Sequence, residues 1–392
     1  MTIGQDWIEE AETDTADRLE SDLFREDEGS EPQSGWTNTA DGAPFGEKDL
    51  SAQFDTAFSY GYSQLSGDEE QLYREILNSL ISYQEETELS VKDPEMVERV
   101  FRYVMADHPE IFYADGYEVT TYRLGTEIRR ITFTGTWTLE SDEVLSRRAQ
   151  LEAAAALWLE GLPDGTDDFE KAKYIYDVLI LRTEYEQGSA DSQTICSVLL
   201  NQRSVCQGYA KTFQYLCQLA GIPAMLVTGD VNGEGHAWNI VFLDGDWYYI
   251  DPTWGDASYQ REEGEETPTL TETVNYDYFC VTTQEIERTH SMDDNQLLPV
   301  CNAVQDQYYR HEGLYLQSAD KEKIDEIFAR AAQKGAPMVC FQCADDTVYQ
   351  EVYRLLIEEQ GIFAYLPESE TTAAYLDSDR ERTFYFWFTE VS

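Results

Sequence analysis

The chain has 392 residues, of which 77 are acidic and 27 are lysine or arginine, so that its formal net charge is −50. A negative field of this size repels phosphate backbones, which excludes nucleic acid as a partner, and it disfavours anionic membrane surfaces. It would steer a basic substrate, such as a lysine-bearing peptide, toward the protein, although solubility alone also explains the charge. Hydrophobic residues make up 42% of the chain, enough to build the two or three domains that this length predicts.

Residues 1–50 form an acidic leader, with 15 acidic residues against three basic ones and few apolar side chains. Such a segment cannot bury enough apolar surface to offset its ordering entropy, so we expect a disordered tail or tether. As an alternative, Trp7, Ile8, Leu23 and Phe24 form an amphipathic segment that docks in the protein's own functional cleft as a built-in inhibitor. The leader lacks the basic start and apolar core of a signal peptide, and the chain has no apolar run long enough for a transmembrane segment.

Residues 51–140 are predicted to form an N-terminal α/β region. Ser66-Gly67-Asp68-Glu69 has the spacing of a capping box and precedes an apolar-periodic helix. Asp93-Pro94 begins a second helix, because proline suits the first helical position. The pattern then predicts two strands and two long helices, near residues 117–124, 129–137, 142–159 and 168–181.

The stretch from Ser204 to Asp256 holds a cysteine, a histidine and an aspartate in three separate contexts. Cys206 opens an apolar-periodic run that ends at Gly221-Ile222-Pro223, which predicts a helix with the thiol in its first turn. The positive end of a helix dipole favours the thiolate, the form that attacks carbonyl groups. His236 begins one extended run and Asp251 ends the next.

The two extended runs are joined by Asp244-Gly245, a strong signal for a two-residue hairpin turn. A turn at this point pairs Trp238 with Asp251, so that His236 lies on the same face of the hairpin as Asp251. Diagonal neighbours on one face are roughly 7–8 Å apart at the backbone, close enough for a carboxylate to reach an imidazole. The pattern therefore predicts a histidine oriented by an aspartate, with a nucleophile on a facing helix.

Three motifs in this stretch closely resemble the transglutaminase-like superfamily, and above all its bacterial transglutaminase-like or cysteine peptidase branch. They are Cys206-Gln207-Gly208-Tyr209-Ala210, Gly235-His236-Ala237-Trp238-Asn239 and Asp251-Pro252-Thr253-Trp254. The resemblance implies an α+β fold with a papain-like transglutaminase core, in which the helix bearing the cysteine packs on an antiparallel sheet. It also implies that Cys206 is the nucleophile, His236 the general base and acid, and Asp251 the residue that orients the imidazole. The resemblance runs from about Asp167 to His290 and is looser upstream from Phe54.

Further site residues follow from the same resemblance. Gln193 lies where related domains carry a polar residue before the nucleophile helix, and it is a candidate oxyanion donor beside the backbone N–H of Cys206. The alternative is local bonding at a helix start, since Asp191-Ser192 has the composition of a cap. Trp238 and Trp254 are expected to form the apolar wall of the cleft, with core packing as the alternative.

The remaining cysteines and histidines indicate no metal or cofactor. The seven cysteines are scattered, which is not the pattern of a disulfide framework. Cys340 and Cys343 have C-x-x-C spacing, but a zinc ion would need two more ligands, and their apolar surroundings indicate structural thiols in a buried strand. We interpret His108, His290 and His311 as structural because none shows a partner arrangement, and there is no calcium-binding loop.

The leading functional hypothesis is a cysteine-dependent acyl-transfer enzyme that acts on peptide or side-chain amides through a thioester. Water as acceptor would make it a peptidase or amidase, which we favour because nothing marks a dedicated amine site. An amine acceptor would make it a transglutaminase that cross-links protein glutamines to amines. The other alternative is a non-catalytic surface or adhesion protein that uses the cleft for binding.

The catalytic domain is predicted to span residues 141–300, and a small α+β domain without visible chemistry to span 301–392. In this last domain the pattern predicts a strand, a helix, a strand, a helix and a closing hairpin, with strands near 314–316, 337–343, 371–376 and 383–390. Read literally, the missing signal peptide means a cytoplasmic protein. Bacterial members of the superfamily are often exported or lipid-anchored, however, so we expect an extracytoplasmic or cell-envelope location.

Overall fold

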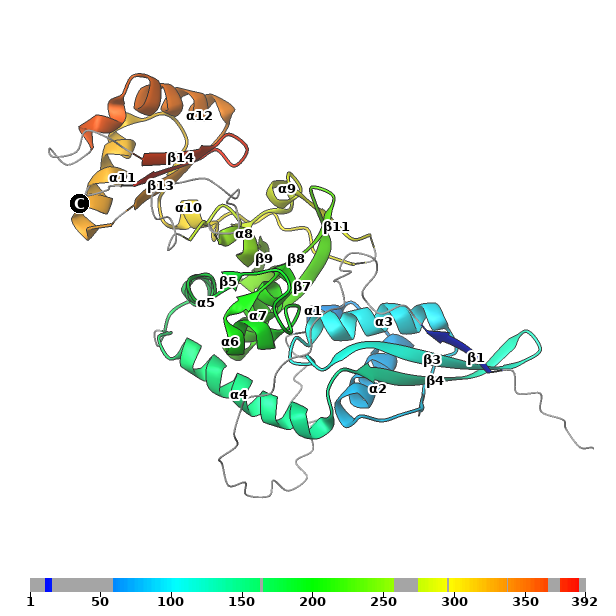
Figure 1. The fold of residues 1–392 in the computed structure, drawn as a ribbon. Coiled ribbons are helices and arrows are strands. Elements are labelled where there is room, and N and C mark those ends of the chain that lie inside the picture. Colours follow the sequence, from blue (N-terminus) through cyan, green and yellow to red (C-terminus); the bar gives the residue numbers. More distant parts are fainter. Residues whose placement is uncertain are drawn as a thin grey trace, which may run out of the picture.

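The computed structural model describes residues 11–15, 59–162, 165–256, 274–294, 296–336, 338–365 and 374–387. They form three parts that follow one another along the chain, coloured blue to cyan, green to yellow, and orange to red in Figure 1. The architecture is α+β with antiparallel sheets, as the sequence predicts. Among the described residues there is no helix with the length and apolarity that a bilayer span requires.

The N-terminal part packs helices on one sheet with strand order β1-β3-β4-β2. Its elements are α1 (Tyr60–Ser63), α2 (Asp68–Ser82), β2 (Thr87–Glu88), α3 (Pro94–Asp107), β3 (Ala114–Leu124) and β4 (Glu127–Trp137). The Asp93 side chain caps α3 as expected, because it accepts from the N–H groups of Glu95 and Met96. At α2 only half of the predicted capping box is present: the Ser66 N–H donates to Glu69 at 3.3 Å, but Gly67 is the N-cap and no side chain caps the helix.

The leader contributes a strand to this part. β1 (Ala11–Thr15) pairs antiparallel with the edge of β3, from Ala11 opposite Tyr122 to Thr15 opposite Glu118. For these five residues the prediction of a disordered leader is wrong. Backbone pairing at a free sheet edge requires no apolar side chains, so composition gives no sign of it. The segment of Trp7 to Phe24 that we considered as an inhibitor otherwise lies outside the described residues.

The central part is built on a five-stranded antiparallel sheet with strand order β10-β9-β8-β7-β11. Its helices are α4 (Ser141–Leu159), α5 (Asp168–Arg182), α6 (Ile195–Asn201), α7 (Cys206–Leu219), α8 (Pro252–Gly255) and α9 (Thr283–Ile286). Its strands are β5 (Glu184–Tyr185), β6 (Arg203–Ser204), β7 (Ala224–Val231), β8 (Glu234–Leu243), β9 (Asp246–Ile250), β10 (Phe279–Val281) and β11 (His290–Met292). Helix α7 begins at Cys206 and packs on β7 and β8, so the helix that bears the cysteine lies on the antiparallel sheet.

The β8–β9 hairpin has the register that the sequence predicts. Asp244 and Gly245 have φ angles of 49° and 102°, the positive values that a two-residue hairpin turn needs at its central positions. The ladder runs down to the pair of Asn239 and Ile250, so the next pair along the hairpin is Trp238 with Asp251. His236 and Asp251 therefore share a face of the sheet.

The third part has its own sheet, in which β12 lies parallel to β13 and the other pairings are antiparallel, with strand order β12-β13-β15-β14. Its elements are α10 (Tyr308–His311), β12 (Tyr315–Leu316), α11 (Lys321–Lys334), β13 (Met338–Cys343), α12 (Asp346–Tyr353), a π-helical turn (Arg354–Glu358), a 3₁₀ turn (Gly361–Ala364), β14 (Ala374–Ser378) and β15 (Thr383–Trp387). Its buried apolar side chains, from Leu316 to Phe386, form a separate cluster. One continuous core, by contrast, runs through the first two parts, from Leu72 in α2 to Phe213 in α7.

Candidate active site

The start of α7 is held against a group of buried serines. The Ser204 hydroxyl donates to the carbonyl of Ser192 at 2.8 Å and lies 2.7 Å from the Ser197 hydroxyl. Gly208 packs over this group: a Cβ on it would come within 1.9 Å of Ser204 Oγ and 2.7 Å of the Ser192 carbonyl oxygen. The glycine of the Cys206 motif thus allows the close approach that fixes the first turn of α7, where Cys206 is 3% exposed.

Two glutamines anchor the far end of α7 to the N-terminal part. The Gln214 amide donates to the carbonyl of Ala106 at 2.7 Å, and the Gln218 amide donates to the carbonyl of Asp107 at 2.9 Å. Both carbonyls belong to the last turn of α3, where helix carbonyls lack intrahelical donors. The position of α7, and with it that of Cys206, is therefore set by α3 as well as by the sheet.

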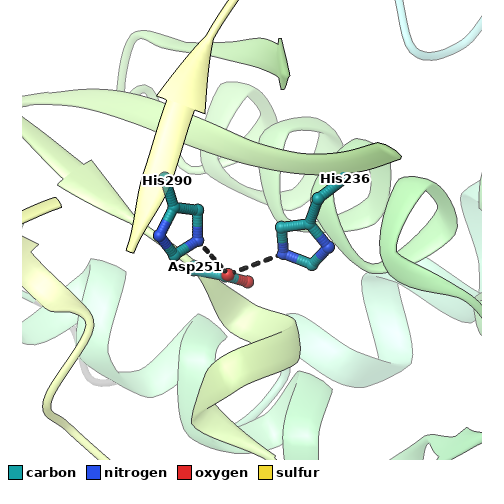
Figure 2. A group of neighbouring side chains, drawn as sticks. All are labelled: His236, Asp251 and His290. Carbon is teal, nitrogen blue, oxygen red and sulfur yellow. Dashed lines mark hydrogen bonds and ion pairs between the residues drawn. The ribbon is translucent and has the colours of Figure 1, made fainter. Parts of the chain in front are cut away.

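His236 from β8 and Asp251 from the end of β9 meet as the hairpin register predicts. His236 Nε2 lies 2.8 Å from Asp251 Oδ2, and both side chains are buried (Figure 2). Burial acts to lower the pKa of His236, but the Asp251 carboxylate and then the neighbouring Cys206 outweigh it and raise the pKa to about 10. Because Nε2 is bonded to Asp251, Nδ1 is the ring nitrogen that remains for the interaction with Cys206.

The Asp251 carboxylate accepts four hydrogen bonds and is 0% exposed. Its Oδ1 accepts from the N–H groups of Thr253 at 2.9 Å and Trp254 at 3.2 Å, which makes Asp251 the N-cap of α8. Its Oδ2 faces His236 on one side and His290 Nε2, at 3.0 Å, on the other (Figure 2). Burial would raise the pKa of Asp251, but the charges and hydrogen bonds of His236 and His290 hold it well below its usual range. The carboxylate is therefore ionised, and both histidine Nε2 atoms donate to it.

His290 was missed by the sequence reading, and the interpretation that it has no partner arrangement is wrong. It begins β11, which pairs with β7 so that His290 lies opposite Val231 and Met292 lies opposite Gly229. Gly229 also lies opposite His236 in β8, and a Cβ on it would come within 2.0 Å of the Ser291 carbonyl oxygen. The missing side chain lets β11 approach, but this non-local pairing leaves no periodic signal in the sequence. His108 and His311 interact with Glu110 and Phe169 instead, outside this cluster.

The two predicted tryptophans occupy different environments. Trp238 is 0% exposed and stacks below His236, with ring centroids 5.9 Å apart, so it supports the site from the core and does not line a cleft. Trp254 is partly buried and lies 5.2 Å from the His290 ring and 4.8 Å from the Tyr278 ring. Trp238 therefore packs in the core, which was the alternative to a place in the cleft wall.

Gln193 is half-buried at the turn that leads into α6. The N-cap of α6 is Thr194, whose hydroxyl accepts from the Cys196 N–H at 3.2 Å, and not the expected Asp191-Ser192. The adjacent Ser192 carbonyl accepts from the N–H of Val205 at 3.5 Å. Gln193 thus lies beside the segment that leads into Cys206.

The buried cluster of His236, Asp251 and His290 is also the one buried group of potential metal ligands among the residues that the structure describes. Its nitrogen–oxygen distances are 2.8 and 3.0 Å, whereas two ligands of one tetrahedral zinc ion would be separated by about 3.3 Å. The shorter observed distances fit two hydrogen bonds better than two ligands of one metal ion. Cys340 and Cys343 belong to different side-chain clusters of the C-terminal sheet and do not face a common site.

Comparison with known proteins agrees with the motifs and the geometry. Residues 159–252 match the sequence profile of the transglutaminase-like superfamily. The chain therefore carries a transglutaminase-like domain, and this superfamily consists in general of cysteine-dependent enzymes, including cysteine peptidases and transglutaminases.

Among curated relatives, kyphoscoliosis peptidase of Homo sapiens is 33% identical over 113 residues, and that of Mus musculus is 32% identical over the same length. These matches cover 24% of this chain, and the chain spans only 17% of the length of each relative. Similar solved structures include a TGase (15% identity, TM-score 0.27, 41% of this chain and 48% of that chain). Another is the periplasmic domain of TgpA from Pseudomonas aeruginosa bound to ethylmercury (19% identity, TM-score 0.23, 33% and 58%).

Proposed function

We propose that the protein catalyses acyl transfer from peptide or side-chain amides through a thioester on Cys206. The observation that carries the proposal is the buried pair of His236 and Asp251, with Cys206 among the groups that raise the pKa of the imidazole. At neutral pH this imidazole is protonated. An imidazolium beside a thiol favours the thiolate, which is the attacking form.

In the first half of the reaction, Cys206 Sγ attacks the substrate carbonyl carbon and a tetrahedral oxyanion forms. The oxyanion collapses, the carbon–nitrogen bond breaks, and His236 transfers its Nδ1 proton to the leaving amine. In the second half, the now neutral His236 removes a proton from the acceptor, which attacks the thioester carbon. The carbon–sulfur bond breaks, the product leaves, and the Cys206 thiolate is restored beside the protonated His236. Throughout, Asp251 holds the proton of His236 on Nε2, so that Nδ1 remains available to the reacting atoms.

The oxyanion requires donors that are already in place. The N–H of Cys206 is one candidate, because it lies at the start of a helix whose N-cap, Val205, supplies no side-chain acceptor. The Gln193 amide is the second candidate, since it lies next to Ser192, which contacts the segment leading into Cys206. Replacing Gln193 with alanine should slow the acylation step by about 10²–10³-fold if it fills this role.

We favour water as the acceptor, which makes the protein a peptidase or amidase. The curated relatives are named as a peptidase, and no described feature marks a site for a second amine substrate. The net charge of −50 favours a basic peptide substrate over an acidic one. A transglutaminase would use the same thioester and differ in the acceptor alone.

Site-resolved alkylation tests the nucleophile without knowledge of the substrate. The protein is treated with iodoacetamide at pH 6, and the modified cysteines are identified by mass spectrometry. Burial raises the pKa of the six other cysteines: Cys196, Cys217, Cys280, Cys301, Cys340 and Cys343. We expect Cys206 to react much faster than these six. Uniformly slow modification of all seven would favour the alternative of a binding protein without catalysis.

A turnover assay separates the two acyl acceptors. Dimethylated casein is incubated with the protein and dansylcadaverine, and peptide cleavage is compared with incorporation of the fluorescent amine. We expect cleavage to exceed incorporation, and both to be absent in Cys206→Ala. The free energy of unfolding of this variant should lie within about 1–2 kcal/mol of the wild-type value, because the substitution removes only the thiol group. Wild-type turnover in Cys206→Ala would refute the mechanism.

A further inference from the structure

We propose that His290 is a positioning residue of this site, which holds the Asp251 carboxylate in the orientation that aligns His236. The inference rests on the proposed function of Cys206, because its effect is transmitted through the imidazole that faces the thiol. Neither the three motifs nor the match over residues 159–252 includes His290, which follows later in the chain.

The first support is the arrangement around a single oxygen. Asp251 Oδ2 receives His236 Nε2 at 2.8 Å and His290 Nε2 at 3.0 Å, and the two rings lie on either side of it (Figure 2). The Oδ1 oxygen is already held by the backbone of α8. Loss of the His290 donor would leave a buried anionic oxygen with His236 as its one remaining partner, which is costly in a site from which water is excluded.

The second support is that His290 is itself held in place. Its Nδ1 lies 2.7 Å from the Thr289 hydroxyl, so both ring nitrogens have partners. Three aromatic rings surround the imidazole, with centroid distances of 4.8 Å to Trp238, 5.2 Å to Trp254 and 5.6 Å to Tyr278. A ring held by two hydrogen bonds and three aromatic contacts can act as a rigid support for the carboxylate.

The third support comes from the chemistry that His236 must perform. A histidine that exchanges its Nδ1 proton with a substrate needs its Nε2 proton fixed by the orienting group. Asp251 can fix this proton only while its Oδ2 points along the hairpin face toward His236. The hydrogen bond from His290 opposes rotation of the carboxylate away from this direction. The charged and titratable groups around His290 are Asp251, His236 and Tyr278.

The test compares two substitutions of His290 by the rate at which iodoacetamide modifies Cys206 between pH 5 and pH 8. His290→Leu removes the donor and should slow modification at pH 6 by about tenfold or more, with the profile moved to higher pH. His290→Gln can place an amide N–H near the Nε2 position and should stay within about threefold of the wild type. His108→Leu is the control, because it removes another buried histidine that contacts a carboxylate, that of Glu110.

The outcomes separate this inference from the proposed function. If the wild type shows no selective modification of Cys206, the proposed function fails. If the wild type is selective and folded His290→Leu reacts at the same rate, His290 has no positioning role. Should His290→Leu not fold, nitrogen NMR of the imidazoles in the wild-type protein gives the answer. We expect a proton on His290 Nε2, and an unprotonated Nε2 would overturn the inference.

Discussion

The hydroxyl of Tyr309 lies 2.6 Å from Asp277 Oδ1, at the contact between the central and C-terminal parts of the chain. The same carboxylate accepts from the hydroxyls of Tyr385 at 2.9 Å and Thr383 at 3.0 Å, both on β15. The Tyr385 hydroxyl also lies 2.7 Å from Asn275 Oδ1, so its one proton is shared between two acceptors. One buried acid therefore joins the segment before β10 to the C-terminal sheet.

Asp277 should make the free energy of unfolding depend on pH. Burial raises the pKa of Asp277 to about 6, against the opposing hydrogen bond from Tyr309. An acid with a raised pKa in the folded state favours folding at low pH, and this contribution is lost as pH rises from about 4 to 6, by up to about 3 kcal/mol. Asp277→Asn should remove this part of the pH dependence, measured by urea unfolding at pH 4.5 and pH 7.5.

A second buried acid, Asp107, contributes a similar pH dependence to the wild type and to Asp277→Asn. Burial also raises its pKa to about 6, and it remains unchanged in both proteins, so the difference between them reports Asp277 alone. Equal pH dependence in the wild type and in Asp277→Asn would contradict the prediction.

His236 should give a second pH dependence, in the alkaline range. Its pKa is raised to about 10 in the folded protein, compared with about 6.5 in an unfolded chain. Its contribution is therefore fully present below pH 6.5 and is lost as pH rises toward 10. His236→Gln should flatten the free energy of unfolding between pH 7 and pH 10. A wild-type protein that unfolds with the same free energy at both pH values would rule out a protonated His236.

Gly208→Ala should disturb the site without altering any proposed catalytic group. The added Cβ would lie 1.9 Å from Ser204 Oγ and 2.7 Å from a backbone oxygen, so the first turn of α7 must shift. We expect a loss of about 1–3 kcal/mol in the free energy of unfolding, together with slower alkylation of Cys206. Adding Ser204→Ala to this variant relieves the closer of the two contacts and should restore part of both losses. No change in either quantity would mean that α7 tolerates a wider spacing.

Removing the leader should affect the stability of the β3 edge but not that of the whole protein. Deletion of residues 1–50 removes β1 and frees the edge of β3 between Glu118 and Tyr122. We expect faster hydrogen exchange at these amides and a thermal unfolding midpoint close to that of the full chain, because an edge strand adds few buried contacts. If the deletion also accelerates alkylation of Cys206, the leader reaches the site and the inhibitor hypothesis is favoured over the tether.

The sequence predicted the features that depend on short-range patterns. The hairpin turn at Asp244-Gly245 fixes a register, and the register brings His236 to Asp251, so both could be inferred from one stretch of chain. The extent of α7 could also be inferred from the local sequence, because apolar periodicity marks the helix and Gly221-Ile222-Pro223 marks its end. The match to the superfamily, over residues 159–252, includes this stretch.

What the sequence did not disclose depends on contacts between distant segments. His290 reaches Asp251 because a three-residue strand pairs with β7 some 60 positions earlier, and so short a strand carries no periodic signal. Asp277 meets β15 more than 100 positions later. Trp238 is fully buried and contacts the ring of His290 on β11, a neighbour more than 50 positions later that the local sequence could not reveal.

The segment from Asn275 to Met292 contacts both the C-terminal sheet and the Asp251 carboxylate. Near its start, Asp277 holds the C-terminal sheet and Tyr278 donates to Glu381 at 2.8 Å; near its end, His290 supports Asp251. Tyr278 also packs on Trp254 and His290. Displacement of the C-terminal sheet would therefore strain the same segment that holds the Asp251 carboxylate in place, and we expect it to change the reactivity of Cys206.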